Sequence, residues 1–195
     1  MMDKESVRNF FNKLAPGWDA DMIRNDEVID IILNNAGVRE GKKILDVACG
    51  TGVLINDYLK RNVGSVTAID ISEKMISIAK SKFDAENVRF ICGDAENYDF
   101  KETFDAIVIY NAFPHFPNSQ TLIEHLSRYL NRGGILTVAH GMSRDKINQH
   151  HQGCAKDVSL GLMTNQELEA IFAQYLDVTV SLSNDDMYQV AGVTR

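Results

Sequence analysis

Lys-Ile-Leu-Asp-Val-Ala-Cys-Gly-Thr-Gly-Val, residues 43–53, joins an apolar run to a turn that contains two glycines. The apolar run, residues 44–48, predicts a buried strand, and residues 53–60 are compatible with a helix. Gly50 and Gly52 permit positive φ and lack a Cβ, so a ligand can touch the backbone where the helix presents free N–H groups. An ordinary β-to-α turn has the same pattern, so the function depends on the residues that follow.

Composition indicates one globular domain, residues 1–195. The chain is 45% hydrophobic and 24% charged, which is enough for a sizeable core. Its formal net charge of -7 disfavours nucleic acid as a partner, because a phosphate backbone is bound by basic surfaces. No apolar run is long enough to span a bilayer, and the N-terminus does not resemble a secretory leader, so we expect a cytoplasmic protein. Three cysteines, Cys49, Cys92 and Cys154, indicate reduced thiols rather than a disulfide framework.

Strand and helix patterns alternate after the glycine turn. Further strands are predicted over residues 65–70, 88–92, 104–110 and 135–139, and helices capped by Ser72 and Ser119 lie between them. A capping box formed by Thr164 and Glu167 predicts one more helix after these strands. Such repeats predict an α/β fold, a Rossmann-like three-layer sandwich whose sheet is mostly parallel. Two final strand patterns, residues 178–182 and 188–193, have only a short connection. They predict a C-terminal antiparallel hairpin at the sheet edge, which brings the sheet to seven strands.

The first forty residues precede the first strand and form an appendage to this sheet. A stripe of apolar residues at helical spacing predicts an amphipathic helix: Val7, Phe10, Phe11 and Leu14. A second helix is predicted before Gly37, and Trp18, the only tryptophan, lies between the two. Residues 1–40 are therefore either a pair of packing helices or a helical lid over a site.

Polar residues stand where the predicted parallel strands end. Ligands of open α/β sheets bind beyond the carboxyl ends of the strands. Asp70 closes the second strand, where a carboxylate can accept hydrogen bonds from both hydroxyls of a ribose. Asp94, beside the backbone N–H of Ala95, closes the third strand and suits an adenine edge, and Asn111 follows the fourth strand. One such residue alone is often only a turn residue, whereas agreement at several strand ends predicts a nucleoside site.

With these residues in place, the chain from Lys43 onward resembles the class I S-adenosylmethionine-dependent methyltransferases. Residues 44–52 are similar to the first motif of that family, with Ala48 where its first glycine is usual. We expect this difference to be mild, because an alanine suits an ordinary φ. The resemblance implies S-adenosyl-L-methionine as the cofactor, with Ala48, Gly50 and Gly52 beside its methionine part and Asp46 near its ammonium group.

The same resemblance implies roles for the later strand ends. Asp70 would hold the ribose, and Ile71 and Met75 would flank the adenine. Asp94 and Ala95 would recognise the adenine edge. Asn111 would lie by the methionine part and the transferable methyl group.

The N-terminal segment is similar to that of the small-molecule methyltransferases that include the quinone-biosynthesis C-methyltransferases. The residues that carry this resemblance are Phe10, Phe11, Ala15, Trp18 and Asp19. It implies that the first helix and Trp18 close over the cofactor and exclude water. The implied function is methyl transfer from S-adenosylmethionine to a small-molecule acceptor, which gives S-adenosylhomocysteine.

Histidines after the fourth and fifth strands are candidates for catalysis. Methyl transfer mainly requires an acceptor held in line behind the methyl group, and a base is needed only when the acceptor carries a proton at neutral pH. His115 and His140 are candidates for a base or for a group that orients the substrate, and His151 is a third. Each also fits a packing histidine.

Residues 141–163 are polar and histidine-rich, which predicts a substrate-facing insertion. A divalent metal is one interpretation, because histidines and a cysteine at these spacings can act together as ligands. The candidate ligands are His140, His150, His151 and Cys154. A polar substrate loop whose histidines only form hydrogen bonds is the alternative. Three other polar residues of the insertion suit a polar or anionic acceptor: Ser143, Arg144 and Asn148.

Two other functional classes stay open. A non-catalytic S-adenosylmethionine-binding regulatory protein would keep the same pocket. A nicotinamide-dependent oxidoreductase would share the glycine turn, but the third glycine and a Tyr-x-x-x-Lys pair are missing from this sequence. The fourth strand does not end in Asn/Asp-Pro-Pro-Tyr, so methylation of nucleobase amino groups is not supported. We expect a monomer or homodimer that acts on a small molecule.

Overall fold

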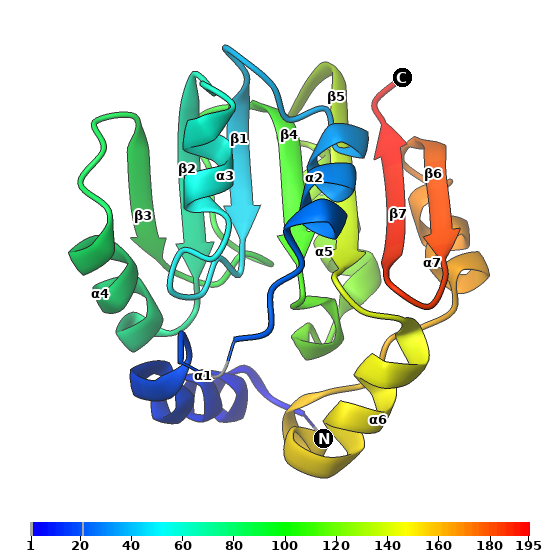
Figure 1. Cartoon of the computed structure of the whole chain (residues 1–195). Helices are drawn as coiled ribbons and strands as arrows, with labels where there is room; N and C mark the ends of the chain where they lie inside the picture. Colours follow the sequence, from blue (N-terminus) through cyan, green and yellow to red (C-terminus); the bar gives the residue numbers. More distant parts are fainter. Residues whose placement is uncertain (1, 21) are drawn as a thin grey trace.

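The computed structural model describes residues 2–20 and 22–195, except for the side chain of Cys154 (Figure 1). The α-helices are α1 (Lys4–Leu14), α2 (Asp26–Asn35), α3 (Ile55–Lys60), α4 (Glu73–Lys82), α5 (Ser119–Ser127), α6 (Arg144–Cys154) and α7 (Asn165–Phe172). Short 3-10 turns are η1 (Ala15–Gly17), η2 (Phe113–His115) and η3 (Lys156–Val158). The strands are β1 (Lys43–Val47), β2 (Ser65–Asp70), β3 (Val88–Cys92), β4 (Phe104–Tyr110), β5 (Leu130–His140), β6 (Asp177–Ser183) and β7 (Tyr188–Val193).

In the described part of the chain, the strands form one seven-stranded sheet with the order β3-β2-β1-β4-β5-β7-β6. Strand β1 pairs parallel with β2 on one side and with β4 on the other, so Asp46 lies between Ala68 and Val108. The last strand, β7, runs antiparallel to both β5 and β6 and is inserted between them. The predicted fold class and closing hairpin are confirmed.

Helices cover both faces of the sheet, and each face has its own apolar core (Figure 1). One face packs against α2, α3 and α4, which contribute Leu33, Ile55 and Ile76. The other face packs against α5 and α7, which contribute Leu126 and Phe172. This three-layer arrangement leaves the carboxyl ends of the parallel strands as an edge that the two helical layers do not cover.

Polar side chains set the starts of most helices, because each accepts a hydrogen bond from an otherwise unpaired backbone N–H. Ser72 accepts from Met75 N at the start of α4, as predicted. Thr164 and Glu167 form the predicted capping box of α7. The prediction for α5 was wrong by one residue: Asn118 is the cap position, and its side chain forms no capping hydrogen bond.

Two helices, α1 and α6, lie beyond the carboxyl ends of β1, β2 and β4 (Figure 1). Val7 of α1 is buried, but Leu14 is 39% exposed, so the predicted apolar stripe is covered only in part. The sequence did not predict α6, because its only buried apolar side chain is Ile147 among the described residues of the helix. In the described part of the chain, we find no helix with the length and apolar character that crossing a membrane requires.

Candidate functional site

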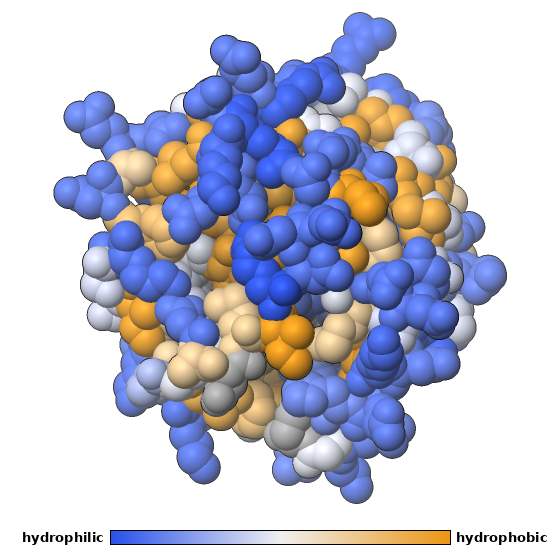
Figure 2. Space-filling model, in the orientation of Figure 1, coloured by the Kyte–Doolittle hydropathy of each residue, from blue (hydrophilic) through white to orange (hydrophobic). Residues whose placement is uncertain are grey.

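A cleft lies at the carboxyl ends of β1, β2 and β4 and has a volume of about 1140 Å³, counting space open to solvent. Figure 2 shows apolar side chains gathered in the lower centre of this face of the molecule. The cleft brings together every predicted cofactor residue except Gly52: Trp18, Asp46, Ala48, Gly50, Asp70, Ile71, Met75, Asp94, Ala95 and Asn111. Sequence positions 18 to 111 therefore meet at one edge of the sheet.

The turn after β1 is built from left-handed backbone conformations. Gly50 has φ +56° and Gly52 has φ +86°. A Cβ on Gly52 would lie 2.7 Å from a ring carbon of Phe83, so this glycine allows close packing of the turn rather than lining the cleft. Ala48 has φ 57°, so the expectation of an ordinary φ at this position was wrong. A β-carbon makes that conformation unfavourable, and the chain accepts this strain at the cleft.

Trp18 covers the glycine turn from the N-terminal segment. Its indole Nε1 would lie 3.8 Å from a Cβ built on Gly50, so the bare backbone of Gly50 faces the indole across the cleft. The ring also makes an edge contact with Phe11, with 5.8 Å between the centroids. Asp19, the next residue, binds the same turn through Thr51 Oγ1 at 2.5 Å and is paired with Lys82. The N-terminal segment is therefore attached directly to the turn.

Asp70 ties the glycine turn to the end of β2. Its Oδ2 accepts from Gly50 N at 2.9 Å and its Oδ1 accepts from Ser72 N at 2.8 Å. Burial raises the pKa of Asp70, although the backbone N–H groups of Ser72 and Gly50 oppose that rise. Each carboxylate oxygen can accept a second hydrogen bond, so the group can still receive hydroxyl donors of a ligand.

Asp46 projects a carboxylate into the floor of the cleft. It is 2% exposed, and its Oδ2 has no hydrogen-bond partner among the described residues. Burial raises the pKa of Asp46 well above its usual range, and the nearby charge of Asp70 adds to the effect. An unpaired carboxylate oxygen inside a protein is costly, so this atom marks a place for a hydrogen-bond donor or a cation of a ligand.

Asp94 is held in place by several donors. Its Oδ2 accepts from Lys4 Nζ at 2.5 Å and from Asn97 Nδ2 at 2.9 Å, and its Oδ1 accepts from Glu96 N at 3.0 Å. The sequence pattern did not reveal the role of Lys4, which lies 90 positions before Asp94. Asn111 has φ 54°, and its Oδ1 accepts from Gly141 N at 2.9 Å. It therefore joins the end of β4 to the segment that follows β5.

His115 lines the cleft, and its ring orientation is fixed. Its Nδ1 lies 2.7 Å from Val158 O. A carbonyl oxygen only accepts, so Nδ1 carries the proton and Nε2 keeps a free lone pair. Burial lowers the pKa of His115 to about 4 and the neighbouring His151 adds to this, while the bond to Val158 opposes it. Near neutral pH, the ring is thus uncharged, and its low pKa makes it a weaker proton acceptor than an ordinary histidine.

The other two candidate histidines lie away from the lining of the cleft. His140 is fully buried, and neither ring nitrogen has a partner among the residues that the structure describes. Burial lowers the pKa of His140 to about 3. The expected contact of His140 with substrate is therefore not seen in this arrangement. His151 packs beside His115 with 4.9 Å between ring centroids, and its Nδ1 is 2.8 Å from Ser159 Oγ.

The structure does not bring the histidines of the predicted metal site together. Within residues 2–20 and 22–195, without the Cys154 side chain, no three His, Cys, Asp or Glu side chains are arranged to hold a metal ion. His150 contacts His151, with 6.0 Å between ring centroids, and His140 is enclosed separately. Cys154, the fourth predicted ligand, has a side chain outside the described part of the structure.

The residues predicted to bind a polar acceptor have structural partners. Ser143 caps α6. Arg144 Nε donates to Leu162 O at 2.9 Å, and the side-chain amide of Asn148 both donates to Leu162 O and accepts from Leu162 N. These contacts hold the end of the insertion against α6, and none of the three residues lines the cleft.

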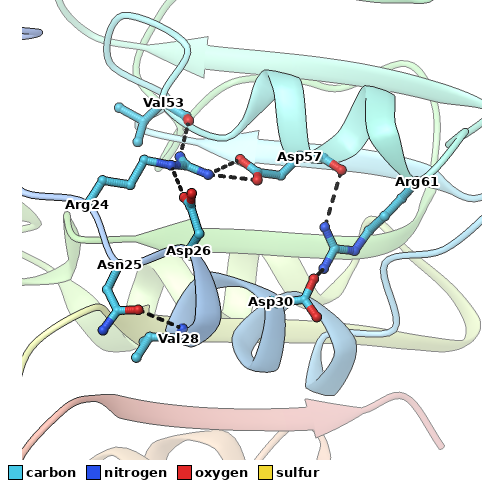
Figure 3. Close-up of polar contacts among 8 residues, drawn as sticks. All are labelled: Arg24, Asn25, Asp26, Val28, Asp30, Val53, Asp57 and Arg61. Carbon is cyan, nitrogen blue, oxygen red and sulfur yellow. Dashed lines mark hydrogen bonds and ion pairs between the residues drawn. The ribbon is translucent and has the colours of Figure 1, made fainter.

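Arg24 also lines the cleft, although the sequence did not single it out. Figure 3 shows its guanidinium group between Asp26, Asp57 and the backbone of Val53. Arg24 Nη2 donates to both carboxylate oxygens of Asp57, each at 2.7 Å. Arg61 pairs with Asp30 of α2 and donates to the backbone oxygen of Asp57 in α3 (Figure 3). The two arginines therefore connect α2 and the residues before it with α3. Because its donors are occupied, Arg24 forms part of the wall of the cleft.

Comparison with known proteins relates this geometry to a family. Residues 44–134 match the family model of the methyltransferase domain. Demethylmenaquinone methyltransferase of Staphylococcus aureus is 30% identical over 147 residues, which are 69% of this chain and 59% of that protein. The ubiquinone/menaquinone biosynthesis C-methyltransferase of Campylobacter jejuni is 28% identical over 162 residues, which are 75% of this chain and 68% of that protein. The chain thus spans about 59% of the length of the Staphylococcus relative.

Solved structures share the fold over nearly the whole chain. A chain in the complex between the Haloferax volcanii Trm112 methyltransferase activator and a methyltransferase superposes with a TM-score of 0.80 at 18% identity, covering 96% of this chain and 97% of that one. Magnesium protoporphyrin IX methyltransferase of Synechocystis, with bound S-adenosylhomocysteine, superposes with a TM-score of 0.72 at 18% identity, covering 99% of this chain and 100% of that one. At these identities the likeness establishes the fold.

Proposed function

We infer that this chain is a class I S-adenosylmethionine-dependent methyltransferase, from its similarity to the methyltransferase domain and to two methyltransferases of quinone biosynthesis. The chain transfers a methyl group from S-adenosylmethionine to a small-molecule acceptor and releases S-adenosylhomocysteine. The observation that carries this proposal is Asp46 at the floor of the cleft, whose buried Oδ2 lacks a partner among the described residues. The ammonium group of the cofactor's methionine part fits this carboxylate, because it is both a hydrogen-bond donor and a cation.

The other residues of the cleft fit the rest of such a cofactor. Gly50 leaves room beside Trp18 for the methionine part, with Ala48 and Asn111 at the ends of β1 and β4. Asp70 keeps acceptor capacity for the ribose hydroxyls. Ile71 and Met75 would flank the adenine. Asp94 and the backbone N–H of Ala95 would recognise its edge. When bound, the cofactor supplies an electrophilic methyl group on a sulfonium.

The chain must then bring a nucleophile in line with that methyl group and exclude water. His115 is the proposed base, because its neutral ring turns a free Nε2 lone pair away from the Val158 carbonyl. It would accept the acceptor's proton at that atom. His151 is a positioning residue beside it. The fully buried His140 acts through packing in this proposal.

Two segments complete the site in the proposed methyltransferase domain, residues 1–195. Residues 1–40 act as a helical lid, supported by the contact of Trp18 with the glycine turn. Residues 141–163 form the wall toward the acceptor, supported by the hydrogen bond between Val158 and His115. We place the enzyme in the cytoplasm, as a monomer or homodimer.

Calorimetric binding and product release test the proposal. We expect the parent protein to bind S-adenosylhomocysteine and not NAD, and an Asp46→Asn variant to bind S-adenosylhomocysteine about tenfold or more weakly, since a charge-assisted hydrogen bond contributes about 1.5–3 kcal/mol. Exposed Asp99→Asn is the control. Acceptor panels assayed for S-adenosylhomocysteine release would then identify the substrate. Binding of NAD in place of S-adenosylhomocysteine would contradict the proposal, and binding with no turnover across broad panels would favour a regulatory role.

A further inference from the structure

Lys4, in the first turn of α1, makes two short ion pairs at one end of the cleft. Its Nζ lies 2.5 Å from Asp94 Oδ2 and 2.5 Å from Glu96 Oε2. The side chain of Glu96 is only 2% exposed, and those of Asp94 and Lys4 are 25% and 31% exposed. All three line the cleft. A single ammonium group therefore neutralises part of the charge of two carboxylates that face the same space.

This arrangement leaves one oxygen of Asp94 for a ligand. Within the described part of the chain, Asp94 Oδ2 accepts from both Lys4 and Asn97, whereas Oδ1 accepts only from Glu96 N. Oδ1 can therefore accept one more hydrogen bond. The Lys4 contact restrains the carboxylate plane, and removing it would leave Asp94 beside a buried Glu96 with no shared counter-charge.

The helix that carries Lys4, α1, also packs against Ile71, which lines the cleft. Val7 and Phe11 of α1 form an apolar cluster with Ile71 and with Val158 of the insertion. Lys4 thus couples the position of α1 to the position of the Asp94 carboxylate.

We propose that Lys4 is a positioning residue that sets the nucleobase specificity of the cofactor site, by holding Asp94 so that Oδ1 accepts a hydrogen bond from the exocyclic amino group of adenine. This inference rests on the proposed function, because it concerns the adenine end of S-adenosylmethionine. It assigns to the N-terminal helix a part in cofactor selection as well as in covering the cleft.

Paired ligands separate this role from simple packing. S-adenosylhomocysteine carries an amino donor at C6 of its base, and S-inosylhomocysteine carries a carbonyl acceptor there. Calorimetric titration of both ligands gives two dissociation constants and their ratio. We expect the parent to prefer S-adenosylhomocysteine, because an acceptor facing Asp94 Oδ1 is repelled. In Lys4→Met, we expect S-adenosylhomocysteine to bind about tenfold more weakly, as for the loss of a charge-assisted contact. The ratio of the two dissociation constants should then approach one.

Matched variants make the result specific. Lys13→Met removes an exposed lysine from the last turn of the same helix. We expect both of its dissociation constants to equal those of the parent. Lys4→Arg keeps a donor cation and is expected to recover much of the preference. Asp94→Asn should lose the preference, and adding Lys4→Met to it should cause no further loss of selectivity, since the two residues act through one contact. Thermal unfolding of each variant checks the fold.

Each outcome bears on the inference. Equal weakening of both ligands in Lys4→Met would overturn it, because that result describes a lid residue without influence on the base. Unchanged affinities in Lys4→Met would also overturn it while leaving the proposed function standing. A parent that binds neither ligand would overturn the proposed function and this inference together. Loss of the preference in Lys4→Met but not in Lys13→Met supports it.

Discussion

At the scale of single residues, the cleft concentrates features that cost stability. Ala48 has a left-handed φ, and among the described residues one buried oxygen of Asp46 and both buried ring nitrogens of His140 have no partner. Strain and unsatisfied polar groups persist where the surrounding structure holds them, and they often lie at functional sites. Asp46 and Ala48 line the cleft, whereas His140 does not.

Ala48→Gly should stabilise the protein. A glycine at φ 57° removes the clash between the β-carbon and the backbone, and the expected gain is about 1 kcal/mol. For a chain of this size the melting temperature should rise by about 2–4 °C, measured by calorimetry. Ala68→Gly, in the buried strand β2, is the control and should lose stability. An unchanged or lower melting temperature for Ala48→Gly would contradict strain at this position.

His140 should make the fold sensitive to acid. Burial holds its pKa at about 3, against an ordinary value of 6.5. Between about pH 3 and pH 6.5 the unfolded chain binds more protons at this residue than the folded chain does. The free energy of unfolding is therefore highest above pH 6.5 and decreases as the pH falls below that value. Between about pH 7.5 and about pH 5, the free energy of unfolding should fall by about 2 kcal/mol less in His140→Phe than in the parent.

Urea unfolding at the two pH values measures this difference. His125→Phe on α5, whose ring binds Tyr98 O, is the control and should keep the acid sensitivity of the parent. If His140→Phe lost as much stability on acidification as the parent, another group would be responsible.

At the scale of elements, polar contacts fasten the N-terminal segment to the loops of the sheet. Lys4 binds the loop after β3, Asp19 binds the glycine turn, and Arg24 binds α3. Exposed ion pairs contribute little to stability, but Asp57 receives Arg24 Nη2 with both oxygens, and the two side chains are only 28% and 11% exposed. Breaking this pair leaves a partly buried charge without its partner.

Arg24→Met should therefore destabilise the protein by about 2 kcal/mol. Adding Asp57→Leu should recover part of that loss, because the uncompensated carboxylate is removed. Urea unfolding measures both values. The control is Arg128→Met, which breaks an exposed pair with Glu124 on α5 and should cost less than about 0.5 kcal/mol. Equal losses in Arg24→Met and Arg128→Met would show that the contact before α2 is no stronger than a surface ion pair.

At the scale of the whole molecule, two segments outside the sheet bound the cleft. The first helix and the insertion lie beyond the carboxyl ends of the parallel strands and meet in a small apolar cluster that includes Val7 and Val158 (Figure 1). The strand ends thus supply most of the proposed cofactor residues, while the segments before β1 and after β5 supply the proposed cover.

Trp18→Ala tests the cover as a unit. Because Trp18 faces the bare backbone of Gly50, we expect S-adenosylhomocysteine to bind about tenfold more weakly in calorimetry, as for the loss of a large aromatic contact. Trp18→Phe should keep most of the affinity. Binding by Trp18→Ala as tight as that of the parent would exclude a role for the N-terminal segment as a lid over the cofactor.

Much of this architecture was predicted from short sequence patterns. The limits of β2, β3, β4 and β7 agree with the apolar runs, and Ser72 and Thr164 cap their helices as expected. The helix α6 was missed because nearly all its described side chains are polar, so that it has no apolar period. Its start is set by Ser143 and its position by contacts with residue Leu162.

By itself, the sequence determined the α/β fold and the strand-end residues that meet in the cleft, because periodicity, turn chemistry and the ends of parallel strands follow from local order. Only the tertiary structure decided the positive φ of Ala48, the burial of His140 and the pairing of Lys4 with Asp94. The reason is physical: a residue's backbone strain, its burial and its charge partner depend on segments that pack against it from distant parts of the chain.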